Sequence, residues 1–167
     1  MAGLVVVTGA NGHIGNNLCK ELLAHGYEVR GTVRSLEKAP PLDMEFVEAD
    51  VLDPDVWEDV FKDATGLFHL ATIYATKGDA QLIHDTANIG TENVLKAASK
   101  CGIERIVYTS STAAVGASPK GVIKNEDNWN DNFSLPYSQA KTDSEKKAWQ
   151  IAEELNLDLR VINPSGV

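Results

Sequence analysis

A tyrosine and a lysine lie four residues apart in the stretch PYSQAK, where Pro136 is expected to start a helix. That spacing places Tyr137 and Lys141 on one helical face. A phenol has an unperturbed pKa of about 10, so it exchanges protons poorly at neutral pH. A nearby ammonium favours the phenolate, which would let Tyr137 act as a general acid or base on a substrate oxygen.

Two serines, Ser110 and Ser111, follow an apolar run at 103–108 that is expected to form a strand. In open α/β sheets, ligands bind at the carboxyl ends of the strands. Ser111 is therefore a candidate to hold the same substrate oxygen by a hydrogen bond. A Tyr-x-x-x-Lys pair alone occurs often by chance, so this prediction depends on the pair following both the serines and a glycine turn.

That glycine turn separates the first predicted strand from the first helical pattern, in LVVVTGANGHIGNNL. Gly9 would allow a tight turn, Gly12 would let the backbone approach a pyrophosphate, and Gly15 would let the helix pack close to the strand. The helix start offers free N–H groups and a positive dipole end. The spacing is G-x-x-G-x-x-G rather than G-x-G-x-x-G, and in this context it predicts a dinucleotide site.

The tip of the second predicted strand, at 27–33, indicates which dinucleotide is expected. In dinucleotide-binding folds an acidic residue about 20 residues after the turn usually binds the ribose hydroxyls. Here Arg34 stands at the tip. A guanidinium matches a 2′-phosphate in charge and in hydrogen-bonding geometry, and Lys38 would add a second cation. The sequence therefore predicts NADP(H) rather than NAD.

Apolar runs alternate with helical periodicity along the whole chain. Strands are expected at 4–7, 27–33, 45–49, 67–70, 103–108 and 159–162, and helices at 14–23, 54–61, 79–100 and 136–155. Asp53 is expected to cap the second of these helices. The alternation predicts an α/β fold: a doubly wound, parallel, six-stranded Rossmann sheet of order 3-2-1-4-5-6 with helices on both faces. Gly90 in the long helix costs about 1 kcal/mol relative to alanine, so close packing is expected to require it.

Composition and charge limit the kinds of partner that this chain is expected to bind. The 167 residues suggest one domain, and 43% hydrophobic and 23% charged residues are ordinary for a globular protein. A net charge of -9 repels phosphate backbones and anionic membranes, so neither nucleic acid nor a membrane is an expected partner. Two cysteines in helical patterns and the lack of a basic leader predict a reducing, cytoplasmic location. No metal site is predicted.

Together these features resemble an extended short-chain dehydrogenase/reductase of the NAD-dependent epimerase/dehydratase superfamily. The resemblance rests on TGANGHIG (8–15), EADVLD (48–53), FHLAT (68–72), NIGTENVL (88–95), YTSST (108–112), YSQAK (137–141) and NPSGV (163–167). The stretches GTVRS and FHLAT are most similar to the dihydroflavonol-reductase-like branch. The family implies hydride transfer between nicotinamide and a small carbonyl or alcohol substrate.

The resemblance also implies cofactor contacts that spacing alone does not. Asp50 and Val51 would meet the adenine ring, residues 70–72 would run beside the riboses, and residues 164–167 would wall the nicotinamide. The expected cofactor set is Gly9, Asn11, Gly12, His13, Ile14, Gly15, Arg34, Lys38, Asp50, Val51, Leu70, Ala71, Thr72, Tyr137, Lys141, Pro164, Ser165 and Val167.

The expected catalytic residues are Ser111, Tyr137 and Lys141. Tyr137 would pass the proton, Lys141 would tune Tyr137 and grip the nicotinamide ribose, and Ser111 would polarise the carbonyl. His13 is given no catalytic role, and His69 is expected to be structural, as part of a strand.

Members of this family normally continue into a second, substrate-binding domain. The chain is therefore expected to be an NADP-binding Rossmann domain, 1–167, that lacks the substrate domain. An open pocket should exclude water poorly, so slow turnover or none is expected. The exposed apolar seam is expected to invite homodimerisation or aggregation.

Two other functions stay open. A sugar-nucleotide epimerase or dehydratase would recycle NAD and typically carries an acidic residue at the tip of the second strand, where this chain has Arg34. A non-enzymatic dinucleotide sensor keeps the sheet but usually lacks the Tyr/Lys pair, which is present here as Tyr137 and Lys141. Both observations favour the reductase.

Overall fold

Six parallel strands form a sheet in the order β3-β2-β1-β4-β5-β6, which confirms the predicted topology. The computed structural model describes residues 3–75 and 78–167. The strands are Leu4–Thr8 (β1), Glu28–Val33 (β2), Glu45–Glu48 (β3), Ala64–His69 (β4), Arg105–Thr109 (β5) and Leu159–Ile162 (β6). The strand order reverses between β1 and β4, so their carboxyl ends lie at the switch point where such folds bind ligands.

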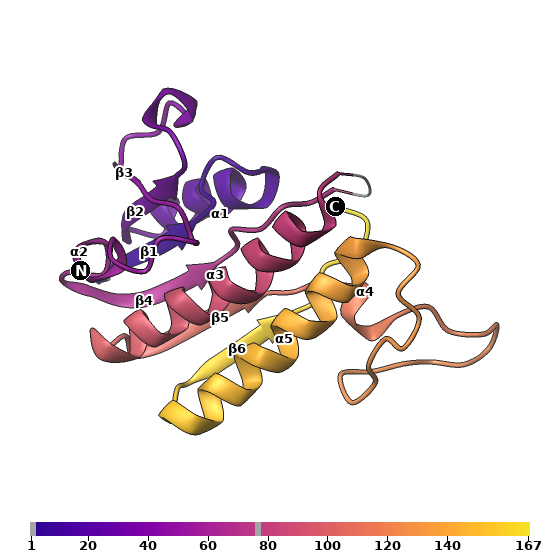
Figure 1. Cartoon of the computed structure of the whole chain (residues 1–167). Coiled ribbons are helices and arrows are strands. Elements are labelled where there is room, and N and C mark those ends of the chain that lie inside the picture. The colour runs from indigo at the N-terminus through magenta and orange to yellow at the C-terminus, as the bar shows by residue number, and fades with distance from the viewer. Residues whose placement is uncertain (1–2, 76–77) are drawn as a thin grey trace.

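Helices cover both faces of this sheet, as expected (Figure 1). They are His13–Ala24 (α1), Trp57–Val60 (α2), Ala80–Lys100 (α3), Thr112–Val115 (α4) and Pro136–Leu155 (α5), with a short 3-10 turn at Leu36–Lys38 (η1). The long helices α3 and α5 run side by side along one face, and α1 lies on the other (Figure 1).

Strand alternation sends the apolar side chains of β1 into two separate cores. Val5 and Val7 pack with Cys19 and Leu22 of α1 on one face. Val6 points the other way, into a larger core with α3 and α5. That larger core also holds Leu67, Val94, Leu95, Ile106, Ala148 and Ile151. The two cores fix both helical layers to the same strands, which sets where the helix ends lie relative to the sheet edge.

Gly90 lies where α3 crosses the segment after β3. A Cβ built at Gly90 would lie 2.5 Å from Cγ2 of the buried Val51. Such a distance is far inside van der Waals contact, so the expectation that close packing requires this glycine is confirmed.

Gly90→Ala should lower the free energy of unfolding by about 1–2 kcal/mol, because overpacking exceeds the gain in helix propensity. Urea denaturation measures the change. The variant Val51→Ala should remove the clash, so the double variant should be less destabilised than the two single changes added together. Additive losses would contradict this packing account.

The second helix is shorter than predicted, and its expected cap was wrong. The Asp53 carboxylate accepts a hydrogen bond from the Asp55 N–H at 3.0 Å and so closes a local turn instead of capping a helix. Helix α2 begins only at Trp57, after Val56, which has no side chain able to cap it. Short polar side chains bond nearby backbone in competition with helix formation, which explains the late start.

The short elements η1 and α4 were not predicted, and the other boundaries differ from expectation by up to three residues. Asp79, expected at the start of the long helix, is the N-cap of α3 and accepts from the N–H groups of Gln81 and Leu82. Over residues 3–75 and 78–167, none of the helices combines the length and the apolar character needed to span a bilayer.

Candidate active site

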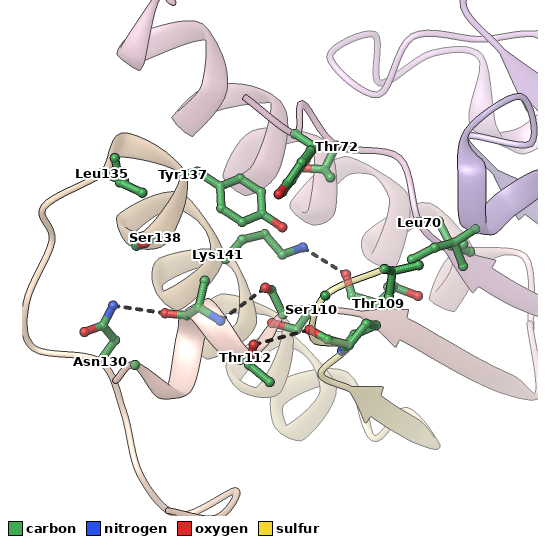
Figure 2. Close-up of a pocket in the computed structure, with 18 of the residues that line it drawn as sticks. Leu70, Thr72, Thr109, Ser110, Thr112, Asn130, Leu135, Tyr137, Ser138 and Lys141 are labelled. Carbon is green, nitrogen blue, oxygen red and sulfur yellow. Dashed lines mark hydrogen bonds between the residues drawn. The ribbon is translucent and has the colours of Figure 1, made fainter. Parts of the chain in front are cut away.

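A cavity of about 830 Å³ opens at the carboxyl edge of the sheet, where β1, β4, β5 and β6 end. Its wall is built by the glycine turn, the segments after β4, β5 and β6, the segment at 130–135 and the start of α5. Figure 2 shows the part of the wall that comes from the segments after β4 and β5 and from the start of α5. Twelve of the sequence-predicted site residues line it: Gly9, Gly12, His13, Ile14, Gly15, Leu70, Thr72, Ser111, Tyr137, Lys141, Pro164 and Val167. The tertiary structure therefore gathers the glycine turn and the three proposed catalytic residues around one space.

The remaining predicted residues lie outside that lining: Asn11, Arg34, Lys38, Asp50, Val51, Ala71 and Ser165. Arg34 and Lys38 are exposed beyond the end of β2. The exposed Asp50 carboxylate accepts from the Leu52 N–H at 2.9 Å, and the Val51 side chain is buried. The four residues just described follow β2 and β3, and these two strands form the end of the sheet beyond β1.

The glycine turn has the conformation that its residues suggested. Gly9 has a φ of 68°, which favours glycine. A Cβ at Gly15 would lie 2.3 Å from the Gly9 carbonyl oxygen, so α1 could not approach β1 this closely with any other residue. The N-cap Gly12 has no capping side chain, and the first turn of α1 contains no acidic residue. Among the described residues, the first N–H groups of α1 therefore have no side-chain acceptor, an arrangement suited to binding an anion.

Lys141 is the most constrained charge of the site. Its side chain is only 2% exposed, and its ammonium donates to the Thr109 carbonyl at 2.9 Å (Figure 2). It also donates to the Tyr108 hydroxyl at 3.5 Å and lies 5.0 Å from the centre of that ring. A buried ammonium requires such partners, because losing water without them is costly. The position of Lys141 is thus fixed from β5.

Tyr108 is a site residue that sequence reasoning missed. An ammonium can only donate, so the Tyr108 oxygen accepts from Lys141. The Tyr108 O–H is then free to donate to Ser144 Oγ at 2.7 Å, and the Ser144 O–H to donate to the Lys141 carbonyl at 3.3 Å. Strand alternation could have revealed Tyr108, since Ile106 and Tyr108 face the same helical layer.

Tyr137 lies in the first turn of α5, immediately after Pro136 at the first helical position. Its half-buried ring packs edge-on against Tyr74, with ring centres 5.1 Å apart. Figure 2 shows the Tyr137 hydroxyl and the Lys141 ammonium pointing into the same part of the cavity. Within the described residues no hydrogen bond joins the two, so the tuning of Tyr137 by Lys141 stays a prediction.

Ser111 connects β5 to α4 and caps that short helix. Its Oγ accepts from the Ala113 N–H at 3.1 Å. Because that bond uses a lone pair, the Ser111 hydroxyl proton is free to be donated to another oxygen. The neighbouring Ser110 is 4% exposed, and its Oγ has no partner among the described residues.

His69 is the last residue of β4 and is buried, which confirms the strand position expected for it. Thr8 Oγ1 accepts from the N–H groups of Leu70 and Ala71, both at 3.0 Å, so its own proton goes to His69 Nδ1 at 2.8 Å. The His69 ring then carries its proton on Nε2 and donates to Thr91 Oγ1 at 3.3 Å. Burial first, and then the Lys141 charge, lower the pKa of His69 to about 3.

The chain also resembles known proteins in sequence. Residues 5–167 match the NAD dependent epimerase/dehydratase family. Cinnamoyl-CoA reductase 1 of Petunia hybrida is 36% identical over 96% of this chain, and anthocyanidin reductase of Arabidopsis thaliana is 32% identical over 95%. A putative dihydroflavonol 4-reductase of Synechocystis sp. is 35% identical over 99% of this chain and 49% of its own length, which confirms the expected branch. The chain covers 53% and 54% of the cinnamoyl-CoA and anthocyanidin reductases, so it spans about half their length.

Solved structures share the fold as well. Yeast methylglyoxal/isovaleraldehyde reductase Gre2, complexed with NADPH, superposes with a TM-score of 0.84 at 28% identity, over 96% of this chain and 56% of that one. UDP-glucose 4-epimerase of Thermus thermophilus, in complex with NAD, gives 0.83 at 26% identity, over 96% and 54%. The glycine turn, the serine after β5 and the Tyr-x-x-x-Lys pair on α5 thus occur in a fold shared with both enzymes. By the match over residues 5–167 and the sheet that carries them, the chain belongs to the NAD dependent epimerase/dehydratase family.

Proposed function

We propose that this chain is the cofactor-binding domain, residues 1–167, of an NADP(H)-dependent reductase that converts a carbonyl to an alcohol. One observation carries the proposal. A single cavity brings the open N-terminus of α1 together with Tyr137, Lys141 and Ser111. The helix N-terminus suits the phosphate groups of a dinucleotide, and the three side chains suit proton transfer to a substrate oxygen.

The residues present fit a dinucleotide. The glycine turn keeps free a space that a Cβ at Gly15 would close, and the N–H groups that follow Gly12 suit a pyrophosphate. Leu70, Thr72 and residues 164–167 would flank the riboses and the nicotinamide. When bound, the cofactor supplies the hydride that adds to the carbonyl carbon.

The protein supplies the proton and the orientation. Tyr137 would donate its hydroxyl proton to the carbonyl oxygen as that oxygen gains charge, which completes the alcohol. Ser111 would donate a hydrogen bond to the same oxygen and hold it beside Tyr137. Lys141, anchored on the Thr109 carbonyl, would stabilise the phenolate that Tyr137 leaves behind. The reverse sequence oxidises an alcohol.

Arg34 supports NADP(H) over NAD. No hydrogen bond or ion pair among the described residues engages its guanidinium, whereas Arg30 on the same strand is bound to Glu45 and to two backbone carbonyls. A free guanidinium just beyond β2 is available to a 2′-phosphate.

One observation favours NAD, the cofactor of the epimerase alternative. Glu48 pairs in register with Val33, so a carboxylate does lie beside the tip of β2. That carboxylate already accepts from the Leu36 N–H at 3.2 Å, which is why we rank NAD second.

Arg34→Ala should weaken NADPH binding by about tenfold or more, the value of a charge-assisted bond, and leave NADH binding unchanged. Titration of nucleotide fluorescence measures both affinities. Glu48→Gln serves as the matched control, and because it removes a negative charge it should keep the preference for NADPH. A wild-type preference for NADH would refute the role given to Arg34, and a failure to bind either nucleotide would refute the proposed function.

A further inference from the structure

Glu145 is a buried carboxylate that the proposed reaction does not use. It lies on α5 one turn after Lys141 and is 5% exposed. Burial of a charge without a role is unfavourable, because apolar side chains of similar volume fill such places at least as well. We propose that Glu145 is a positioning residue that acts through Asn163 to hold the Ser111 edge of the cavity. The inference rests on the proposed dinucleotide function.

The contacts of Asn163 carry this inference. Its Nδ2 donates to Glu145 Oε2 at 2.8 Å and to the Ser111 carbonyl at 3.1 Å. A carboxylate and a carbonyl can only accept, so the orientation of the amide follows from the chemistry of its partners. Both protons of the amide nitrogen are therefore used, one on α5 and one on the residue that caps α4.

The backbone connects the same segment to the cavity wall. The Ser110 N–H donates to the Ile162 carbonyl at 2.8 Å, and the Thr112 N–H donates to the Pro164 carbonyl at 3.1 Å. The segments that follow β5 and β6 thus run together to the cavity, with Asn163 between the two bonds. Ser111 and Pro164 both line the cavity, so Asn163 holds that part of the wall from behind.

Two opposite charges on one face of α5 therefore hold neighbouring residues of the cavity edge. Lys141 bonds directly to the Thr109 carbonyl, and Glu145 reaches the Ser111 carbonyl through Asn163. The spacing of four residues places both side chains on one helical face. Loss of Glu145 should free the Ser111 edge and leave the glycine turn and the Arg34 region intact.

The test compares two ligands on Glu145→Ala. NADPH occupies the whole dinucleotide site, whereas adenosine 2′,5′-bisphosphate carries only the adenine and 2′-phosphate half. The variant should bind NADPH about tenfold more weakly than wild type, the factor for one hydrogen bond to a charged group. Its affinity for the bisphosphate should not change. Glu145→Gln keeps an oxygen acceptor for Asn163 and should restore most of the NADPH affinity.

Two controls separate positioning from general stability. Ile151→Val alters a buried residue further along α5 and should lower the thermal midpoint with no difference between the two ligands. Asn163→Ala removes the amide that joins Glu145 to the Ser111 carbonyl, and Asn163 is less buried than Glu145. This variant should show the same loss of NADPH affinity, and it tests the inference if Glu145→Ala does not fold.

Equal weakening of both ligands by Glu145→Ala, or unchanged NADPH binding, would overturn this inference alone. Binding of neither ligand by the wild-type chain would overturn the proposed function and this inference with it.

Discussion

Tyr137→Phe should lower the rate of carbonyl-dependent NADPH oxidation by about 10²–10⁴-fold, the usual contribution of a positioned general acid. The affinity for NADPH should stay unchanged, because the ring and its edge-on contact with Tyr74 are retained. Only the proton that would be passed to the substrate oxygen is lost. The rate is best followed with protein in excess over NADPH, so that slow turnover is still measured.

Tyr27→Phe is the matched control. Tyr27 stands just before β2 and does not line the cavity, so removal of its hydroxyl should leave the rate unchanged. A Tyr137→Phe variant that keeps the wild-type rate would remove Tyr137 from the proposed mechanism.

Acid should destabilise the protein through His69. Its folded pKa is about 3, because burial and the charge of Lys141 oppose protonation, whereas an unfolded histidine titrates at about 6.5. Between these values the unfolded chain binds one more proton than the native state. The stability that this site contributes is therefore complete above about pH 6.5 and falls by up to about 1.4 kcal/mol per pH unit as the pH decreases toward 3.

Urea denaturation between about pH 7.5 and about pH 5, a range that includes the upper part of that window, tests the slope. The variant His69→Asn keeps an acceptor for Thr8 and should flatten the dependence on pH, whatever its own stability. His25→Asn, at the exposed end of α1, should keep the wild-type slope. Hydrogen bonds from Lys96 and Lys147 lower the pKa of Glu92 to about 2. The stability that Glu92 contributes is therefore lost only at a pH below the tested range, so it does not affect the measured slope. An unchanged slope in His69→Asn would contradict this account.

The motifs of this chain are local, and most of its local patterns predicted the elements that the structure shows. Strand and helix periodicity predicted the sheet order, because right-handed crossovers leave few ways to arrange such a chain. The steric demands of Gly15 and Gly90 were also foreseen, since glycine in these contexts points to close packing. Patterns could not show that short polar side chains would delay α2 until Trp57, because Asp53 suits a turn as well as a helix cap.

The sequence by itself determined which residue types meet at the carboxyl edge of the sheet: glycines after β1, serines after β5, and the Tyr137 and Lys141 pair on α5. Only the tertiary structure decided what holds them. Lys141 is secured by Tyr108 and a backbone carbonyl, and Ser111 by a carboxylate that acts through an amide. These partners come from elements distant in the chain and satisfy buried polar groups one by one. A polar group needs such a partner only when packing has removed it from water, and the periodicity of a sequence does not show which partner it will find.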